Sequence, residues 1–219
     1  MGKKLKILVL TATLTCFASS FVSAETIATD TFIQSDTNDK VKQASYSDEL
    51  ITKDGFRYQV NSDETITITG YEGNETEISI PNEIDGKSVT SIGNMAFLDC
   101  SNLSEINIPE GITSIGDYAF HNCSSLSEIK IPESVTSIGD CAFSSCSSLS
   151  EINIPEGVTS IGYYAFHNCS SLRKINISKG VTSIGDCAFS GCSSLSEINI
   201  PEGVTSIGKF AFYNCSSLR

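Results

Sequence analysis

Two copies of the hexapeptide FHNCSS contain the only histidines of the 219-residue chain, His121 and His167. In each copy the histidine is followed by an asparagine and then by a cysteine, Cys123 or Cys169. Cysteine, histidine and asparagine are the residue types of a thiol protease, in which a nearby base activates the thiolate. Cysteine and histidine together also bind zinc. The hexapeptide therefore raises two hypotheses, nucleophilic catalysis and a metal centre, which the surrounding elements must support or exclude.

A 23-residue repeat determines where these residues lie. The tripeptide SIG begins at Ser91, Ser114, Ser137, Ser160, Ser183 and Ser206, and a cysteine recurs at Cys100, Cys123, Cys146, Cys169, Cys192 and Cys215. A fixed period of this length is typical of solenoid proteins, in which each repeat forms one coil. The sequence therefore predicts a repeat solenoid of about six coils over residues 78–219.

The unit that begins at Cys123 shows how one coil is built. Its Leu126–Ile131 segment has the L-x-x-I-x-I spacing of a leucine-rich repeat and predicts a short strand. Pro132 ends this strand, because it cannot donate a hydrogen bond to a sheet. Val135–Ile138 predicts a second extended stretch, and Cys141–Ser145 has room for only one turn of α or 3₁₀ helix. Burial within one coil cannot offset the conformational entropy of ordering it, so neighbouring coils must stack.

The same geometry argues against both hypotheses for the hexapeptide. His121 and His167 are 46 residues apart, hence two coils apart, so their parallel side chains cannot converge on one zinc ion. Each thiol is expected to face the core, whereas each imidazole lies on a partly exposed outer turn. The other four coils replace His-Asn by Leu98-Asp99, Ser144-Ser145, Ser190-Gly191 and Tyr213-Asn214. We therefore predict no catalytic residue, metal site, cofactor or enzymatic activity.

The repeated cysteines are expected to form a column of free, buried thiols. Equivalent residues of stacked coils lie about 4.7–4.9 Å apart, which a disulfide would tolerate, but their side chains point in the same direction. Two further cysteines, Cys141 and Cys187, lie two coils apart and should not bond to each other. A link between Cys141 and Cys146 within one coil remains an open alternative.

The outward positions of the predicted strands form the candidate partner-binding surface. Between the inward apolar residues stand two polar rows, which we expect on the concave face of the solenoid: Glu105, Glu128, Glu151, Lys174 and Glu197 in one row, and Asn107, Lys130, Asn153, Asn176 and Asn199 in the other. Repeat proteins use such extended surfaces to bind partners. The alternative is a solvated sheet face with an asparagine ladder, because these rows lack the aromatic residues that are frequent in binding hot spots.

The N-terminal 77 residues are predicted to contain three different segments. Residues 1–24 have a basic start, an apolar run and the small-residue site Val22-Ser23-Ala24, as in a secretory signal peptide cleaved after Ala24. Residues 25–49 are polar and predict a disordered linker. Residues 50–77 predict an N-terminal β cap, because Phe56–Val60 and Ile66–Ile68 alternate apolar and polar residues around a turn, as in a β-hairpin.

Two irregularities interrupt the repeat. The Asn82–Lys87 segment contains a five-residue insertion in the first coil, which we expect to form a loop. The sequence stops at Arg219, before the next strand would begin and without a closing cap, so the solenoid is expected to be incomplete at its C-terminus.

The charge balance limits the kinds of partner. The chain has a net charge of −12, and removal of residues 1–24 takes away three lysines and no acidic residue, which changes it to −15. A strongly acidic chain is not expected to bind nucleic acid or an anionic membrane surface. No second long apolar run follows the signal peptide, so we expect no membrane insertion after its removal.

The repeated pattern L-x-x-I-x-I-P-x-x-V-T-S-I-G-x-x-A-F-x-x-C resembles the BspA-like bacterial leucine-rich repeats from about Ile78 to Arg219. This resemblance implies a right-handed leucine-rich repeat coil with a parallel β-sheet on the concave side. It also implies a secreted or cell-surface protein that binds a protein partner, possibly a host extracellular or matrix protein, in adhesion. The alternative is a structural spacer segment of a larger surface protein, without a ligand of its own.

Overall fold

The computed structural model describes residues 50–219, which lie within one compact unit. The predicted signal peptide, residues 1–24, and the predicted linker, residues 25–49, therefore lie outside the described residues.

The described part begins with three antiparallel strands, β1 (Leu50–Ile51), β2 (Phe56–Val60) and β3 (Ile66–Tyr71). The predicted hairpin is confirmed as the β2–β3 pair, in which Val60 lies opposite Ile66. Val60 itself is exposed. The other alternating apolar side chains of the two strands are buried and join the same core as the repeats: Phe56, Tyr58, Ile66 and Ile68. Strand β3 then pairs in parallel with β6 (Lys87–Ile92), so the cap continues directly into the solenoid.

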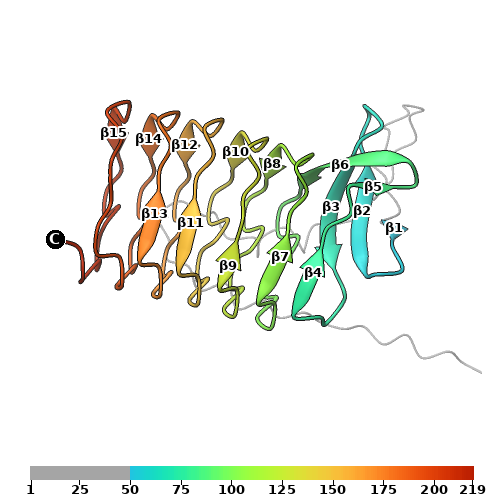
Figure 1. The fold of residues 1–219 in the computed structure, drawn as a ribbon, viewed down its shortest axis with the longest axis horizontal. Coiled ribbons are helices and arrows are strands. Elements are labelled where there is room, and N and C mark those ends of the chain that lie inside the picture. Colours follow the sequence, from blue (N-terminus) through green and yellow to red (C-terminus); the bar gives the residue numbers. More distant parts are fainter. Residues whose placement is uncertain (1–49) are drawn as a thin grey trace, which may run out of the picture. The chain divides into compact units, whose positions relative to one another are not determined.

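The coils stack through two series of short parallel strands, which we call ladders, and each ladder consists of two separate hydrogen-bonded sheets (Figure 1). The first ladder contains β4 (Glu77–Ser79), β7 (Glu105–Asn107), β9 (Glu128–Ile129), β11 (Glu151–Asn153) and β13 (Lys174–Asn176). The second contains β6, β8 (Ser114–Ile115), β10 (Ser137–Ile138), β12 (Ser160–Ile161), β14 (Ser183–Ile184) and β15 (Ser206–Ile207). The pairing is interrupted between β9 and β11 in the first ladder and between β10 and β12 in the second. Paired residues are 23 positions apart, as in Ser183 with Ser206, except between β4 and β7, where the insertion makes the separation 28. This spacing confirms the predicted period and the solenoid fold.

The turn that follows the second-ladder strand in each coil differs from the prediction. Residues 50–219 contain no helix, so the single helical turn expected at Cys141–Ser145 is wrong. Every second N–H here donates to the next coil: Phe143 N–H donates to the carbonyl of Ala165 at 2.9 Å. The intervening N–H groups close local turns, as from Ser144 to the carbonyl of Cys141 at 3.0 Å. A helix would need all of these donors for itself, so stacking of the coils replaces it.

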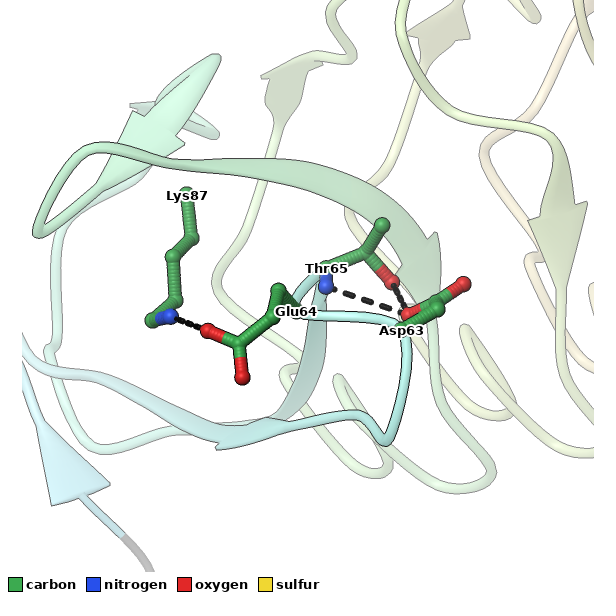
Figure 2. A network of polar contacts seen from close by, with 4 residues as sticks. All are labelled: Asp63, Glu64, Thr65 and Lys87. Carbon is green, nitrogen blue, oxygen red and sulfur yellow. Dashed lines mark hydrogen bonds and ion pairs between the residues drawn. The ribbon is translucent and has the colours of Figure 1, made fainter.

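The insertion after β4 is also more ordered than the predicted loop. Strand β5 (Glu83–Ile84) pairs antiparallel with β6 through a turn with positive φ at Asp85 and Gly86. The side chain of Lys87 forms an ion pair with Glu64, in the β2–β3 turn, and Figure 2 shows this contact. In the same turn, the Asp63 carboxylate accepts hydrogen bonds from the backbone N–H and the hydroxyl of Thr65, at 3.1 and 2.7 Å. The insertion is therefore attached to the cap.

A continuous column of aromatic rings runs through the core. One phenylalanine per coil stacks on the next with ring centroids 5.2–5.5 Å apart and interplanar angles of 2–8°. All of these rings are buried except Phe212, which is partly buried. The column contains Phe97, Phe120, Phe143, Phe166, Phe189 and Phe212. Each inner ring is covered by the rings of both neighbours, so a coil completes its burial only within the stack.

Candidate functional site

The ten residues predicted to form the binding surface are all exposed and follow the first ladder. We call this set, Glu105, Asn107, Glu128, Lys130, Glu151, Asn153, Lys174, Asn176, Glu197 and Asn199, the EIN face. Seven of them lie within strands β7, β9, β11 and β13, and Lys130 follows β9 directly. Glu197 and Asn199 differ, because the structure assigns no strand to the segment that contains them.

Neighbouring rows of the EIN face interact through their side chains. The Nζ atom of Lys174 lies 2.9 Å from Oε1 of Glu151, and both side chains remain at least half exposed. The Asn176 amide donates a hydrogen bond to the side-chain oxygen of Asn153. Exposed ion pairs typically contribute about 0–1 kcal/mol, so these groups can exchange their contacts for a partner at little cost.

A second row of charges, which was not predicted from the sequence, borders this face. It contains the exposed residues Glu110, Glu133, Glu156, Lys179 and Glu202, one per coil, which we call the turn row. The Nζ atom of Lys130 lies 3.2 Å from Oε1 of Glu110, and Glu156, Lys179 and Asn199 line one groove. The turn row and the EIN face therefore form one surface. The recurrence of a charged residue at this position of every repeat was the signal available in the sequence.

The two histidines lie on the outer turns, as predicted, but their rings are not fully in solvent. Both residues are half-buried, and each Nδ1 is buried without a hydrogen-bond partner. The His121 ring contacts Tyr118 edge-to-face at 5.7 Å, and the His167 ring contacts Tyr164 at 5.3 Å. Burial lowers the pKa of both imidazoles, so both are neutral at neutral pH.

The thiols of the repeated cysteine position, which include the two beside these histidines, point into the core. The Sγ atoms of Cys123, Cys146, Cys169 and Cys192 each donate to a phenylalanine carbonyl oxygen of the preceding coil at 3.1 Å. Burial raises the pKa of all four, and it raises that of Cys146 and Cys192 to about 12. A nucleophilic cysteine needs the opposite shift. Cys141 and Cys146 form no disulfide, so the alternative link between them is not formed.

The repeat pattern assigns the chain to a family. Six copies of the "BspA type Leucine rich repeat region" match residues 71–179 and 159–219. The chain belongs to this family of bacterial leucine-rich repeat proteins. This confirms the resemblance inferred from the spacing of leucine, isoleucine, glycine and cysteine.

Solved structures of leucine-rich repeat proteins are similar to this member of the BspA-type family. A Treponema pallidum leucine-rich repeat protein is 33% identical with a TM-score of 0.67, over 77% of this chain and 90% of the other. A leucine-rich cell surface protein of Faecalibacterium prausnitzii is 34% identical with a TM-score of 0.65, over 77% of this chain and 52% of the other. A Bacteroides ovatus leucine-rich repeat protein is 30% identical with a TM-score of 0.64, over the same shares. This chain thus spans about half the length of the last two. None of the curated proteins matches it.

Within residues 50–219, no group of three or more His, Cys, Asp or Glu side chains is arranged to hold a metal ion. The same residues include no helix that is long and apolar enough to cross a membrane. The exposed, mutually paired side chains of the EIN face and its turn row form the candidate functional site that the geometry supports best.

Proposed function

We propose that this chain is a secreted or cell-surface protein that binds a protein partner through the EIN face, in adhesion to host extracellular or matrix proteins. The observation that carries the proposal is the EIN face itself, a row of exposed charges and amides repeated at strand spacing on a packed scaffold. Strands fixed by a stacked core present such side chains with little loss of conformational entropy on binding.

Two further observations support the location and the partner. The predicted signal peptide, cleaved after Ala24, would send the chain out of the cell. The similar F. prausnitzii protein is described as a cell surface protein. The acidic surface favours a partner with basic groups, because complementary charges accelerate association and fix orientation.

Binding of the predicted mature chain, residues 25–219, to a panel of purified matrix and plasma proteins tests the proposal. Surface plasmon resonance should detect at least one partner, with binding that weakens as salt rises. Changing Glu105, Glu128, Glu151 and Glu197 to lysine should abolish this binding.

The matched control changes Asp54, Glu72, Glu75 and Glu83 to lysine, which alters the net charge equally but only in the cap and in the insertion attached to it. This control should bind its partner more strongly than the EIN variant does. Equal loss in both variants would move the site away from the EIN face. Absence of binding to the whole panel would favour the spacer alternative.

A further inference from the structure

A groove crosses three successive coils at the corner after the second-ladder strands β12, β14 and β15 (Figure 1). Its volume is about 440 Å³, within the range of ligand pockets. The SIG tripeptides of these strands line it, together with three larger side chains that each follow such a tripeptide: Asp140, Tyr163 and Asp186. The groove belongs to the second ladder and shares no residue with the EIN face or the turn row.

Tyr163 is the one aromatic residue at its position of the repeat. The other five coils have a polar residue there: Asn94, Asp117, Asp140, Asp186 and Lys209. Tyr163 is 55% exposed, so its ring adds little to the core. Its backbone is nonetheless held on both sides, because its N–H donates to Oδ1 of Asp140 and its carbonyl accepts from the N–H of Cys141, both at 2.8 Å. The groove therefore presents an aromatic side chain from a fixed backbone.

Two carboxylates flank this tyrosine, one on the coil before it and one on the coil after it. Equivalent positions of stacked coils are about 4.7–4.9 Å apart, so Asp140 and Asp186 both lie within reach of a group that contacts the Tyr163 ring. Oδ1 of Asp140 accepts from Tyr163 as described above, and Oδ1 of Asp186 accepts from the N–H of Lys209 at 2.7 Å. Within residues 50–219, Oδ2 of each aspartate makes no hydrogen bond, and Lys209 makes no ion pair with Asp186.

This combination of groups fits the side chain of an arginine or a lysine. A cation above a tyrosine ring is attracted by the negative face of the ring. A guanidinium group also stacks on aromatic rings and donates hydrogen bonds to carboxylates. Tyrosine is frequent in binding hot spots, whereas the EIN face has no aromatic residue.

We infer that this groove binds a basic segment of a protein, with an arginine or lysine side chain against the ring of Tyr163 and its charge beside Asp140 and Asp186. The site goes beyond the proposed function, because it lies on the other ladder and does not require the EIN face to bind anything. A neutral saccharide would also stack on the ring, but it would leave both carboxylates without a counter-charge. A basic segment fits better, and the net charge of −12 attracts it from solution.

NMR titration of residues 25–219 with an acetylated, amidated tetra-arginine peptide tests the inference, at about 0.15 M salt, where distant charges are screened. Amide shifts locate the bound peptide and give its dissociation constant. The largest shifts should fall on the amides of Gly162, Tyr163 and Gly185, which line the groove.

Tyr163→Asp separates the groove from simple attraction between opposite charges. The variant has natural precedents for folding, because Asp117 and Asp140 occupy the same position of other coils. It should bind the peptide about two- to fivefold more weakly, because the ring is lost. Attraction to the net charge alone predicts the opposite, since this variant is more acidic than the wild type.

Asp140→Asn/Asp186→Asn removes both charges of the groove and keeps the Oδ1 acceptors. Asn94 is the precedent, because its Oδ1 accepts from the N–H of Asp117 at 2.8 Å. This double variant should bind the peptide roughly fivefold more weakly. The matched control, Asp99→Asn/Asp117→Asn, removes two charges outside the groove and should change the affinity by less than about twofold.

Circular dichroism melting should show a cooperative transition for every variant, and if Tyr163→Asp does not fold, the double variant and its control decide. Unchanged or tighter binding by folded Tyr163→Asp, equal losses in the double variant and its control, or shifts centred on the EIN face would each overturn the inference. So would chitotriose, a neutral saccharide probe, if it shifted the same amides at lower concentration than the peptide. The matrix-protein measurement depends on the EIN face, so either proposal can fail while the other stands.

Discussion

Cys146 is fully buried, and its Sγ donates to the carbonyl oxygen of Phe120 at 3.1 Å. The neighbouring coils repeat this arrangement every 23 residues. His167, beside the next thiol of the column, lies on the outer turn with its Nδ1 buried and unpaired. Sequence periodicity placed the thiols correctly because burial of a small apolar group follows the repeat. It could not show the orientation of the imidazole, which depends on contacts with Tyr164.

The thiol column gives the protein a predictable sensitivity to high pH. Burial raises the pKa of Cys146 from its ordinary value near 9 to about 12. Between these values the unfolded chain releases the thiol proton and the folded chain retains it, so the free energy of unfolding falls as pH rises from 9 to 12. Each such thiol contributes a slope of about 1.4 kcal/mol per pH unit. Below pH 9, where both states are protonated, this dependence disappears.

Urea unfolding of residues 25–219 between pH 8 and pH 11 measures this slope. Cys146→Ala should make the decline shallower, because one of the titrating thiols is gone. Val135→Ala is the control, since it truncates a buried side chain of the same coil without removing a titrating group. It should lower stability at every pH and keep the wild-type slope. A wild-type slope in Cys146→Ala would contradict the argument.

At the scale of the element, the corner after each second-ladder strand brings two backbones into close contact. A Cβ atom added at Gly185 would lie 2.8 Å from the backbone C and O of Gly162 and the N of Tyr163. Only glycine leaves this space free, which explains why the tripeptide SIG occurs in all six repeats. The corner therefore sets how closely consecutive coils approach.

Gly185→Ala is expected to destabilise the protein by about 1–3 kcal/mol, because overpacking forces the two coils apart. Gly203→Ala is the matched control, since its added Cβ would lie 3.3 Å from the nearest atom, the carbonyl oxygen of Lys179. Chemical denaturation of the two variants should place the midpoint of Gly185→Ala below that of Gly203→Ala. Equal midpoints would indicate that the corner can relax without cost.

The elements were predictable where the period alone determines them. Alternating apolar residues identified the β2–β3 hairpin, and the L-x-x-I-x-I spacing identified the strands of the first ladder. The turn at Cys141–Ser145 was not predictable in this way, because its N–H groups are shared between coils. The segment with Glu197 and Asn199 was not predictable from its pattern either, because that pattern matches the earlier strands although the structure assigns no strand there.

At the scale of the whole described solenoid, stability and surface both follow from neighbouring coils. The phenylalanine column, the hydrogen bonds from cysteine thiols to carbonyl oxygens and the strand ladders all connect one coil to the next. The charged surface also depends on neighbouring coils, because Lys174 of β13 pairs with Glu151 of β11 in the adjacent coil. Family membership identifies the scaffold, whereas the partner depends on side chains that differ from coil to coil.

Deletion of one complete repeat is the test that belongs to this scale. Removal of residues 124–146 joins Cys123 to Ser147 and keeps every later residue in register, so the shortened chain should fold with one coil fewer. Urea unfolding should show a cooperative transition at a lower midpoint, because one interface between coils is lost.

Removal of residues 124–134 joins Cys123 to Val135 instead, which deletes the strand that contains Glu128 and Ile129 and places Val135 where a serine belongs. This second chain should lose its cooperative transition and aggregate, because no neighbour can cover the broken coil. A well-folded monomer from the partial deletion, measured by sedimentation and circular dichroism, would show that stacking in register does not determine the fold.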